Sequence, residues 1–460
     1  MNLLQALRLS SAPRLALVGA GGKTTALFQI AREYNSPVLV TATTHLSQEQ
    51  VKLGDQHNTI SSPEQIESLQ PHNIQGVCVF TGPPDSSGRL TGLPDPLLEC
   101  LLRLAEAMSA PLLIEADGSR QLPVKAPAAH EPVIPTFVDT VVVLAGLSAL
   151  GKPLSSQTVH RPEEFARLSG LSSGDVIDAG ALRRVLVQPE GGLKGIPPGA
   201  RRILLLNQAD TDALQSQAHA MLLQRSDHPG LLPAYHAVVI ASLAQEQVFA
   251  VHEPVAGILL AAGGASRFGS PKQLLSYQGM PLVRRLARVA LASGLWPMIV
   301  VSGAYTSEIR QALEGLAVDL LHNPHWQEGQ STSVKAGVNA LPPEAGAVIF
   351  FLADQPFVDE SLVRALVEVH AQSLAPIVAP MMDGRRWNPV MFDRRTWGDF
   401  ASLTGDAGGR ALFSRYPATW VPWHDPRLLL DVDTPEDYQR LIDQHGGEAD
   451  QLPSFEEPDY

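Results

Sequence analysis

The stretch "LLAAGGASRFGSPKQLL", residues 259–275, joins an apolar run to a glycine-rich loop that carries two cations. Its glycines allow the backbone to approach a ligand closely and to turn several N–H groups toward it, which suits a polyphosphate. Arg267 and Lys272 add positive charge to the same loop. A tight turn with two exposed cations is the alternative. The order A-A-G-G-x-S-R-x-G-x-x-K favours a phosphate-binding loop that differs from the common G-x4-G-K-[ST] pattern.

The apolar pattern around this loop predicts an α/β domain. Strands are expected at 255–261, 297–303 and 347–354, and helices at 281–293 and 306–314. Alternation of this kind is typical of a largely parallel sheet, whose ligands lie at the carboxyl ends of the strands. The glycine loop follows the first of these strands, so it lies where such a ligand is expected.

Two carboxylates are candidate magnesium ligands. Asp354 ends a strongly apolar strand, and Asp433 lies in "LDVDTP", which reads as a second strand end. Magnesium bound to phosphates needs one or two carboxylates together with water. The alternatives are structural: Asp354 caps a turn before Pro356, and Asp433 or Thr434 caps a helix that begins near Pro435.

Three hydroxyl side chains stand just before a predicted helix in "EGQSTSVKAG", residues 328–337. Ser331, Thr332 and Ser333 can hold an anion together with the helix N-terminal amides, either on the acceptor substrate or on the nucleotide. Plain capping of the helix is the alternative, and the two roles are compatible.

A second glycine–lysine loop, "VGAGGKTT" at 18–25, follows an apolar strand and precedes a helix. It is shorter than the usual phosphate-binding loop but keeps the same physical parts. Lys23 is placed for phosphates, Thr24 for magnesium, and Gly21 and Gly22 for a tight turn at a helix N-terminus. The N-terminal half is therefore predicted to hold a second nucleotide site.

Further strands are expected at 111–118 and 202–210, so the N-terminal half is also predicted to be a P-loop-like α/β domain with a largely parallel sheet. Polar residues at the ends of these strands complete the second site. "LLIEADG" offers Glu115 or Asp117 as a magnesium-directed carboxylate. "LLLNQAD", residues 204–210, resembles the N-K-x-D element with which GTPases recognise guanine, so Asn207 and Asp210 are candidates for reading a purine base. N-x-x-D is weak by itself, and a turn is the alternative.

Length and composition indicate a soluble protein of several domains. The 460 residues exceed one ordinary core, and the net charge of −13 argues against a nucleic-acid or membrane-surface role. Two cysteines, Cys78 and Cys100, have no metal-binding spacing, and no apolar run reaches membrane-spanning length, so a cytoplasmic location is expected. We expect an N-terminal domain at 1–250, a C-terminal domain at 251–445 and an acidic disordered tail at 446–460, with the segment 244–254 as the join.

The C-terminal half resembles the molybdenum cofactor cytidylyltransferases, which are MobA-like NTP transferases with a Rossmann-like fold. Besides the opening stretch, the resemblance rests on "NPHWQEGQSTSVKAG" (323–337), "FLADQPFVD" (351–359), "TGDAGGR" (404–410) and "LDVDTPEDY" (430–438). It implies transfer of CMP from MgCTP to Mo-molybdopterin, with Arg267, Lys272 and Asp354 as catalytic residues and Asp354 and Asp433 on magnesium. The implied nucleotide-binding residues are Ala261, Ala262, Gly263, Gly264, Lys272, Ser302 and Gly303. The implied acceptor-binding residues are Ser331, Thr332, Ser333, Asn388 and Pro389.

One segment departs from that family. Where the family has Gly-His-Pro or Gly-Asn-Pro facing the acceptor, this chain reads "GRRWNPV", with Trp387 before Asn388. The larger side chain puts the pterin-facing contacts in question, rather than the nucleotide site.

The N-terminal half resembles the selenium-dependent hydroxylase accessory family. "TATTHL" (41–46) and "EADGSRQLPVKAPAAHEPVIP" (115–135) carry the resemblance, and they include His45, Lys125 and His130. It implies work in the maturation of molybdenum hydroxylases, with a hydroxylase of the xanthine dehydrogenase type as recipient. Three alternatives remain for the whole chain: the same fold using GTP, a sugar phosphate as acceptor, or a non-catalytic carrier of the finished cofactor.

Overall fold

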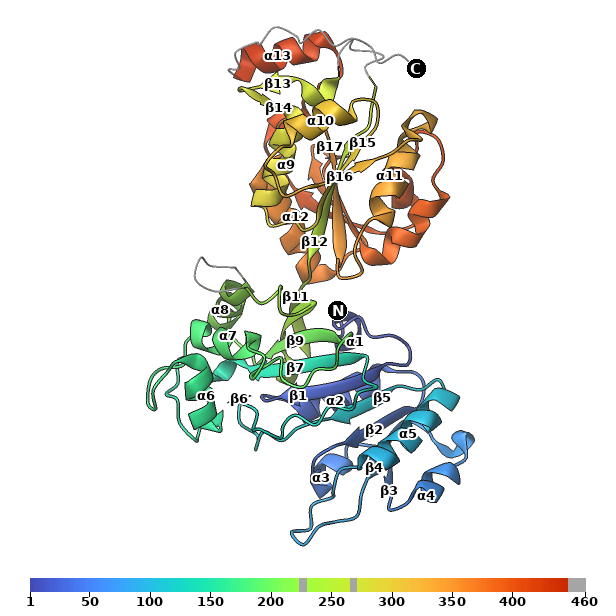
Figure 1. The fold of residues 1–460 in the computed structure, drawn as a ribbon, viewed down its shortest axis with the longest axis vertical. Helices are drawn as coiled ribbons and strands as arrows, with labels where there is room; N and C mark the ends of the chain where they lie inside the picture. Colours follow the sequence, from blue (N-terminus) through green and yellow to red (C-terminus); the bar gives the residue numbers. More distant parts are fainter. Residues whose placement is uncertain (223–229, 265–270, 446–460) are drawn as a thin grey trace. The chain divides into compact units, whose positions relative to one another are not determined.

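The computed structural model describes residues 1–222, 230–264 and 271–445. The chain forms two compact units, Met1–His252 and Glu253–Tyr460. Each is a mixed α/β unit built on its own sheet (Figure 1). Within the described part of the chain, no helix is long and apolar enough to cross a membrane.

The first unit is built on a nine-stranded sheet in the order β11-β10-β9-β7-β1-β5-β2-β4-β3. All of its neighbouring strands are parallel except β11, which pairs antiparallel with β10. The strands are β1 (Arg14–Gly19), β2 (Val38–Ala42), β3 (Gln56–Thr59), β4 (Val77–Thr81), β5 (Leu112–Glu115), β7 (Thr140–Gly146), β9 (Arg201–Asn207), β10 (Ala237–Ser242) and β11 (Gln247–His252). The short strands β6 (Val124–Lys125) and β8 (Val159–His160) pair separately. The main helices are α2 (Lys23–Glu33), α5 (Asp95–Ala107), α6 (Pro162–Ser169), α7 (Ala179–Val187) and α8 (Asp212–Leu222).

The second unit has a mixed sheet in the order β16-β15-β12-β17-β20-β18-β19, with β21 paired to β18. Its strands are β12 (Val255–Ala261), β15 (Met298–Ser302), β16 (Asp319–His322), β17 (Ala347–Leu352), β18 (Ile377–Met382), β19 (Arg385–Arg386), β20 (Val390–Asp393) and β21 (Ala418–Pro422). A separate hairpin joins β13 (Ser276–Tyr277) and β14 (Met280–Pro281). The main helices are α9 (Leu282–Ala292), α10 (Thr306–Ala312), α11 (Gln330–Asn339), α12 (Glu360–Ser373) and α13 (Pro435–His445).

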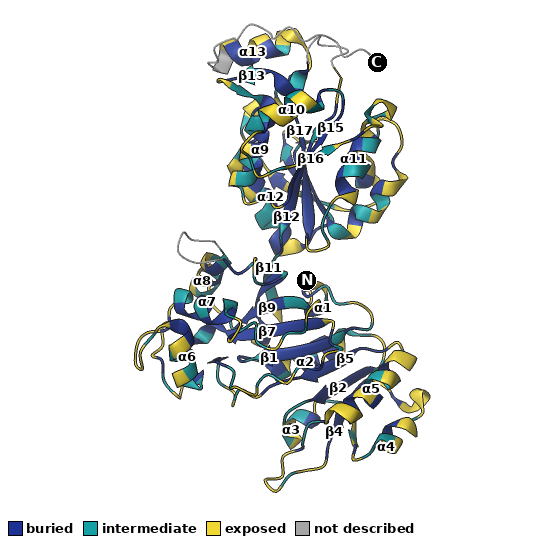
Figure 2. Ribbon diagram, in the orientation of Figure 1, coloured by how far each residue is buried: buried dark blue, intermediate teal, exposed yellow. Residues whose placement is uncertain are grey.

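Alternation along β12 shows why this sheet is covered on both faces. Val255 and Leu259 belong to one apolar cluster, together with side chains of α9 and α12. Ala256 and Ile258 point the other way, into a cluster with α11. Figure 1 shows α9 and α12 on one side of the sheet and α11 on the other, and Figure 2 shows the strands between them as buried.

The predicted join at 244–254 has a different structure. Gln247–His252 is the edge strand β11, which pairs with β10 throughout its length. Its sequence "QVFAVH" carries a short continuous apolar run, Val248–Val251, which is consistent with a strand. A cut at residue 250 would therefore remove part of a strand from the first sheet. The predicted tail at 446–460 lies outside the described residues.

Candidate functional site

The second unit has a cavity of about 430 Å3 at the carboxyl ends of β12 and β17. It is lined by Ala261–Gly264 from the end of β12, by Asp354 after β17, and by Lys272 in a short 3-10 helix at Lys272–Leu274. The amide of Gln273 donates to the Gly263 carbonyl at 3.1 Å, which fixes the described part of the loop. Arg267 lies outside the described residues.

Ser302 and Gly303 support this loop from behind instead of lining the cavity. Ser302 is fully buried and accepts a hydrogen bond from Thr306. A side chain at Gly303 would lie 2.5 Å from the Ala262 carbonyl oxygen. The glycine therefore allows the loop to approach the neighbouring strand end.

Asp354 is a buried carboxylate with an unsatisfied oxygen. Its Oδ1 is buried and has no hydrogen-bond partner among the described residues. Burial and the nearby Asp431 and Asp433 raise the pKa of Asp354 to about 6, while Lys272 opposes this shift. The Val432 N–H donates to the Asp354 carbonyl at 2.9 Å, which places the segment 431–433 beside β17. A cation would relieve the excess negative charge there.

Asp431 and Asp433 hold different partners. Asp431 accepts from the Gln355 amide at 2.9 Å, and burial is the main cause of its raised pKa. Asp433 lies 2.6 Å from the Lys272 ammonium and is exposed. It does not cap α13, because the Thr434 hydroxyl accepts from the Asp437 N–H at 3.2 Å. Among the described residues, no group of three His, Cys, Asp or Glu side chains forms a ready metal site.

The three hydroxyls at the start of α11 divide between support and the cavity. Thr332 donates to the Gly329 carbonyl and accepts from Asn323, so it holds the helix start. Ser331 is buried, and its N–H donates to the Gly405 carbonyl. Ser333 also accepts from Asn323, at 2.9 Å, and alone among the three lines the cavity beside Asp354.

A second cavity of about 540 Å3 adjoins the first and shares Leu260, Gln330, Leu352 and Asp406 with it. Trp387 and Asn388 line it, with Pro389 next in the chain after a cis peptide bond. Arg386 and Arg410 also line it, and neither forms an ion pair with a described residue. Burial and the charge of Arg410 lower the pKa of Arg386, whose guanidinium lies 4.4 Å from the centre of the Phe413 ring. Asp406 and Asp431 also line the cavity, but the two guanidinium groups, which have no ion-pair partner among the described residues, offer donors to an anion.

In the first unit, the loop between β1 and α2 is held in a conformation that requires glycine. Gly21 and Gly22 have φ of +82° and +123°. A side chain at Gly21 would meet the Gly146 backbone at 2.5 Å, and one at Gly22 would meet Asn207. The Thr24 hydroxyl donates to Glu115 at 3.1 Å and accepts from Gln50. Burial raises the pKa of Glu115, and this pair closes the end of the loop nearest β5.

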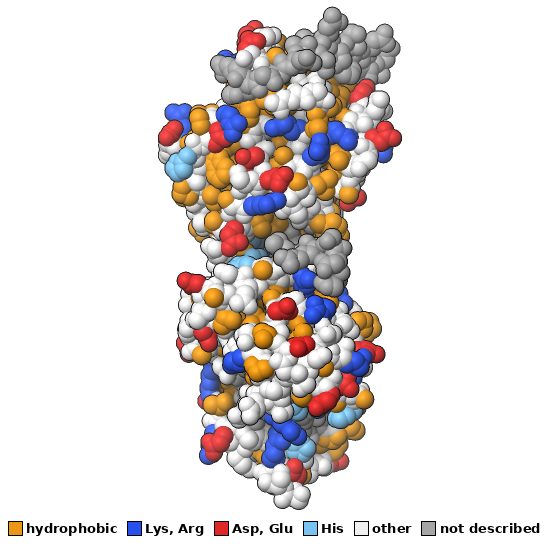
Figure 3. Space-filling view, turned by 90° about the vertical axis from the view of Figure 1, so that its left-hand side faces the viewer, with side chains coloured by type: hydrophobic (Ala, Val, Ile, Leu, Met, Phe, Trp, Pro, Cys, Tyr) orange, Lys and Arg blue, Asp and Glu red, His pale blue; other side chains and the backbone are white. Residues whose placement is uncertain are grey.

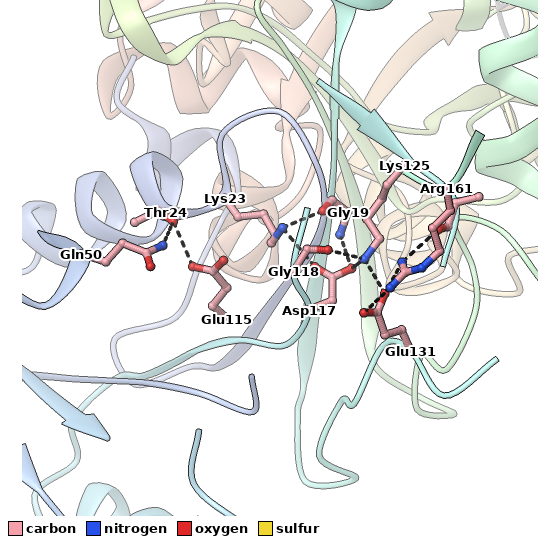
Figure 4. Close-up of polar contacts among 11 residues, drawn as sticks. Gly19, Lys23, Thr24, Gln50, Glu115, Asp117, Gly118, Lys125, Glu131 and Arg161 are labelled. Atoms are coloured by element: carbon pink, nitrogen blue, oxygen red, sulfur yellow. Dashed lines mark hydrogen bonds and ion pairs between the residues drawn. The ribbon is translucent and has the colours of Figure 1, made fainter. Parts of the chain in front are cut away.

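A chain of ion pairs, buried at Lys23, Asp117 and Lys125 and partly exposed at its far end, leads away from the loop (Figure 4). Lys23 lies 3.1 Å from Asp117 and donates to the Gly19 carbonyl. Asp117 also accepts from Lys125 at 2.8 Å, and Lys125 donates to Glu131 at 2.7 Å. Arg161 completes the chain with two hydrogen bonds to Glu131. Although burial opposes it, these bonds lower the pKa of Glu131 to about 2.

Asn207 and Asp210 both form hydrogen bonds within the protein. Asn207 donates to the Gly21 carbonyl at 2.6 Å and accepts from the Leu243 N–H at 2.9 Å. Asp210 accepts from the Ser242 hydroxyl with one carboxylate oxygen, Oδ1. In this structure Asn207 therefore positions the glycine loop, and Asp210 retains Oδ2 as its candidate contact to a base.

Comparisons with known proteins match the two units separately. The YqeC protein family matches residues 15–163, and the MobA-like NTP transferase domain family matches residues 257–420. "Uncharacterized protein YqeC" of Escherichia coli (strain K12) is 31% identical over 200 residues, covering 42% of this chain and 75% of the relative. "Nicotine blue oxidoreductase" of Paenarthrobacter nicotinovorans is 31% identical over 199 residues, covering 41% of this chain and 96% of the relative.

The chain belongs to both families. Its second unit also matches a "Probable molybdenum cofactor guanylyltransferase" of Bacillus cereus (strain ATCC 10987 / NRS 248), with 30% identity over 134 residues, 28% of this chain and 64% of the relative. The MobA-like family transfers nucleotides, which implies a nucleotide substrate and usually a divalent metal.

Several residues of the MobA-like unit are absent from the sequence-based prediction. Asp431 stands two positions before Asp433 in the same motif, so the motif itself was the available signal. Arg386 and Arg410 are 24 positions apart, and only folding brings them together. In the YqeC unit, Lys125 lies in a quoted motif, but its partnership with Asp117 and Glu131 needed the structure.

Proposed function

We propose that the MobA-like unit transfers CMP from MgCTP to the phosphate of Mo-molybdopterin, giving molybdopterin cytosine dinucleotide and pyrophosphate. The observation that carries the proposal is the unsatisfied oxygen of Asp354 in a cavity that also holds the glycine loop and Lys272. An oxygen of the acceptor phosphate attacks the α-phosphorus of CTP, and the bond from that phosphorus to the bridging oxygen of pyrophosphate breaks. Such a reaction depends on placement and charge neutralisation more than on a covalent group.

The chain's own residues have distinct tasks in this step. The loop Ala261–Gly264 binds the nucleotide phosphates through its backbone, and Lys272, with Arg267 from outside the described residues, neutralises them. Ser333 offers a hydroxyl to the same cavity. Lys272 is held at the site by Asp433, so that its charge is in place before the nucleotide binds.

Asp354 suits a divalent cation because its free oxygen faces added negative charge from Asp431 and Asp433. Magnesium commonly takes one or two carboxylates and completes its shell with phosphate and water oxygens, so a third protein ligand is not needed. Asp354, with Asp433 or Asp431, would hold the ion, which would supply neutralisation of the phosphate charge.

The adjoining cavity suits the acceptor. Arg386 and Arg410 would bind its phosphate, while Trp387 and Asn388 would face the pterin. Guanidinium groups match phosphate geometry with paired donors. The shared wall of the two cavities lets the acceptor phosphate approach the nucleotide.

Replacing Arg410 with Ala should raise the KM for the acceptor about tenfold and leave CTP affinity unchanged, because a charged hydrogen bond contributes about 1.5–3 kcal/mol. Initial rates over an acceptor titration, with CTP affinity measured separately, check this. Arg310→Ala, which changes an arginine outside both cavities, should alter neither quantity. Loss of CTP affinity in Arg410→Ala would place that residue with the nucleotide instead.

The deciding experiment is pyrophosphate release by the full chain with Mo-molybdopterin and CTP, GTP, ATP or UTP in turn. The proposal expects release with CTP alone and formation of the cytosine dinucleotide. The guanylyltransferase name of one relative makes GTP the main rival, and release with GTP would transfer the assignment to it. Sugar phosphates in place of the pterin test the other acceptor class. If the chain binds the finished cofactor but releases no pyrophosphate with any nucleotide, the non-catalytic carrier role is favoured.

Lys272→Ala should lower pyrophosphate release about 100-fold, because one charged contact to the reacting phosphates is lost. The Lys272 side chain is partly exposed in the short 3-10 helix Lys272–Leu274, so folding should be retained, as circular dichroism would show. Lys335→Ala, outside the described cavities, is the matched control. A folded Lys272→Ala protein with the parent rate would remove Lys272 from the mechanism.

We further propose that the YqeC unit binds a nucleoside triphosphate at Gly21, Gly22, Lys23 and Thr24, with Asp210 and the loop-positioning Asn207 on the base side. Support comes from the glycine conformations, the placement of Lys23 and the Thr24–Glu115 pair. Together the units would serve maturation of a molybdenum hydroxylase of the xanthine dehydrogenase type in the cytoplasm. Any connection with selenium rests on the sequence resemblance.

A further inference from the structure

The YqeC unit contains a cavity of about 1190 Å3, which exceeds the roughly 300–1,000 Å3 of a typical single small-molecule site. One side is the glycine loop with Lys23 and Thr24. The other side, called here the far wall, consists of 118–121, 130–131 and 160–161. Figure 4 shows the ion-pair chain running from Lys23 to Arg161 between these two sides. The cavity therefore has room beside a nucleotide bound at the loop.

The far wall carries positive charge that its own carboxylate does not balance. Glu131 already accepts from both Lys125 and Arg161. Arg120 forms no hydrogen bond or ion pair with a described residue. Burial, followed by the positive charges of Arg161, Lys125 and Arg120, lowers the pKa of His160 to about 4. His160 is therefore neutral near pH 7, and the positive charge nearby comes from the lysine and the arginines. An anion would find an unpaired guanidinium in this wall.

Non-glycine residues with positive φ are concentrated around this cavity. The described chain has ten non-glycine residues with positive φ, and four of them line this cavity: Arg120 (51°), Gln121 (61°), Arg161 (65°) and Gln208 (62°). Such conformations are uncommon for residues with a side chain and persist where the surrounding structure fixes them, often at ligand sites. The far wall is therefore preformed.

We propose that the far wall binds the anionic group, a phosphate or a carboxylate, of a second small molecule, with Arg120 as its ion partner and Arg161 as a further donor. The YqeC unit is then a two-substrate site, with the nucleotide at the glycine loop and an anionic partner opposite. The inference rests on the proposed nucleotide site for the identity of the neighbour, but not for the anion site itself.

Titration of the full chain with inorganic phosphate and, separately, with acetate tests the anion site. Arg120→Ala should weaken binding of the preferred probe about tenfold or more, and Arg120→Lys should retain part of it. Arg167→Ala, which changes an exposed arginine outside the cavity, should bind like the parent. Phosphate sites in the MobA-like unit contribute equally to every protein, so the difference between variants reports the far wall. Preference for one probe identifies the anion as phosphate or carboxylate.

The same titration with saturating MgATP separates the two ligands. The proposal expects the Arg120-dependent binding to persist in MgATP. If MgATP abolishes it, the far wall and the loop hold one ligand's phosphates and the two-substrate site is wrong. Equal binding by parent and Arg120→Ala overturns the anion site. If ATP affinity is the same in parent and Lys23→Ala while Arg120 still governs anion binding, the nucleotide proposal fails and the far wall stands.

Discussion

Replacing Asp354 with Asn should lower nucleotidyl transfer about 1,000-fold and, in the absence of divalent cations, stabilise the protein above pH 6. Asparagine keeps the shape of aspartate but removes the charge that a hard cation needs. Folding raises the pKa of Asp354 from 3.8 to about 6, mainly through burial. Its contribution to stability is thus present below pH 4 and is lost as the pH rises through about 6. Removing this unfavourable ionisation should increase the free energy of unfolding at pH 8 by about 1–3 kcal/mol.

Tryptophan fluorescence can follow this effect in the full chain, because all six tryptophans lie in the MobA-like unit. Urea unfolding at pH 5 and pH 8 with a chelator gives the stability difference, and pyrophosphate release gives the rate. Asp393 is the matched control, since it is buried but accepts hydrogen bonds from His370 and Arg395. Asp393→Asn should destabilise the unit. An Asp354→Asn protein that turns over like its parent at saturating magnesium would place the metal elsewhere.

Local sequence patterns predict most of the fold. Apolar runs such as "RLALVG" and "AVIFFLAD" correspond closely to β1 and β17. Buried strands on parallel sheets must be apolar on both faces, so their signal is strong. Both glycine loops lie directly after strands, as their sequences predict. The strand β11 escaped prediction because its four-residue apolar run was taken as part of a linker ending at Pro254, although the strand completes the sheet edge.

The sequence predicts which residues lie at the candidate sites better than it predicts which of them pair. The loop Ala261–Gly264 and Asp354 come from separate motifs whose positions at strand ends bring them together. Which carboxylate pairs with which cation depends on distances of a few ångströms, and sequence spacing does not determine those distances. Asp433 pairs with Lys272, whereas Asp354 keeps a free oxygen. Asn207 reads as a base contact in the sequence, yet its amide is engaged by the glycine loop.

The distribution of charge on the surface says less about the ligands of this protein than the charges that line its cavities. On the face drawn in Figure 3, Lys and Arg side chains are interspersed with Asp and Glu among the described residues. Such a mixture fits the acidic total charge and gives no broad basic footprint for a nucleic acid on that face. The proposed functions depend instead on the cations that line the cavities, where neighbouring carboxylates decide whether each charge is paired.

Replacing Asp117 with Ala should lower the free energy of unfolding of the YqeC unit by about 3–5 kcal/mol, the usual cost of leaving buried charges unpaired. Asp117 is 2% exposed and lies between the buried ammonium groups of Lys23 and Lys125. It also accepts from the Gly19 N–H at 3.0 Å, which ties the glycine loop to the neighbouring strand end. Without it, two like charges face each other and the loop loses a bond.

Far-UV circular dichroism of the full chain should then show a first unfolding transition, at lower urea, that tryptophan fluorescence does not follow, since the YqeC unit has no tryptophan. Glu190→Gln is the exposed control: it breaks the surface pair with Arg167 and should cost less than about 1 kcal/mol. Asp117→Asn should fall between the two, because its amide oxygen still accepts from Gly19 but carries no charge. A loss below 1 kcal/mol for Asp117→Ala would mean that the lysines are neutralised by other groups, and the ion-pair chain would then not be what holds the glycine loop.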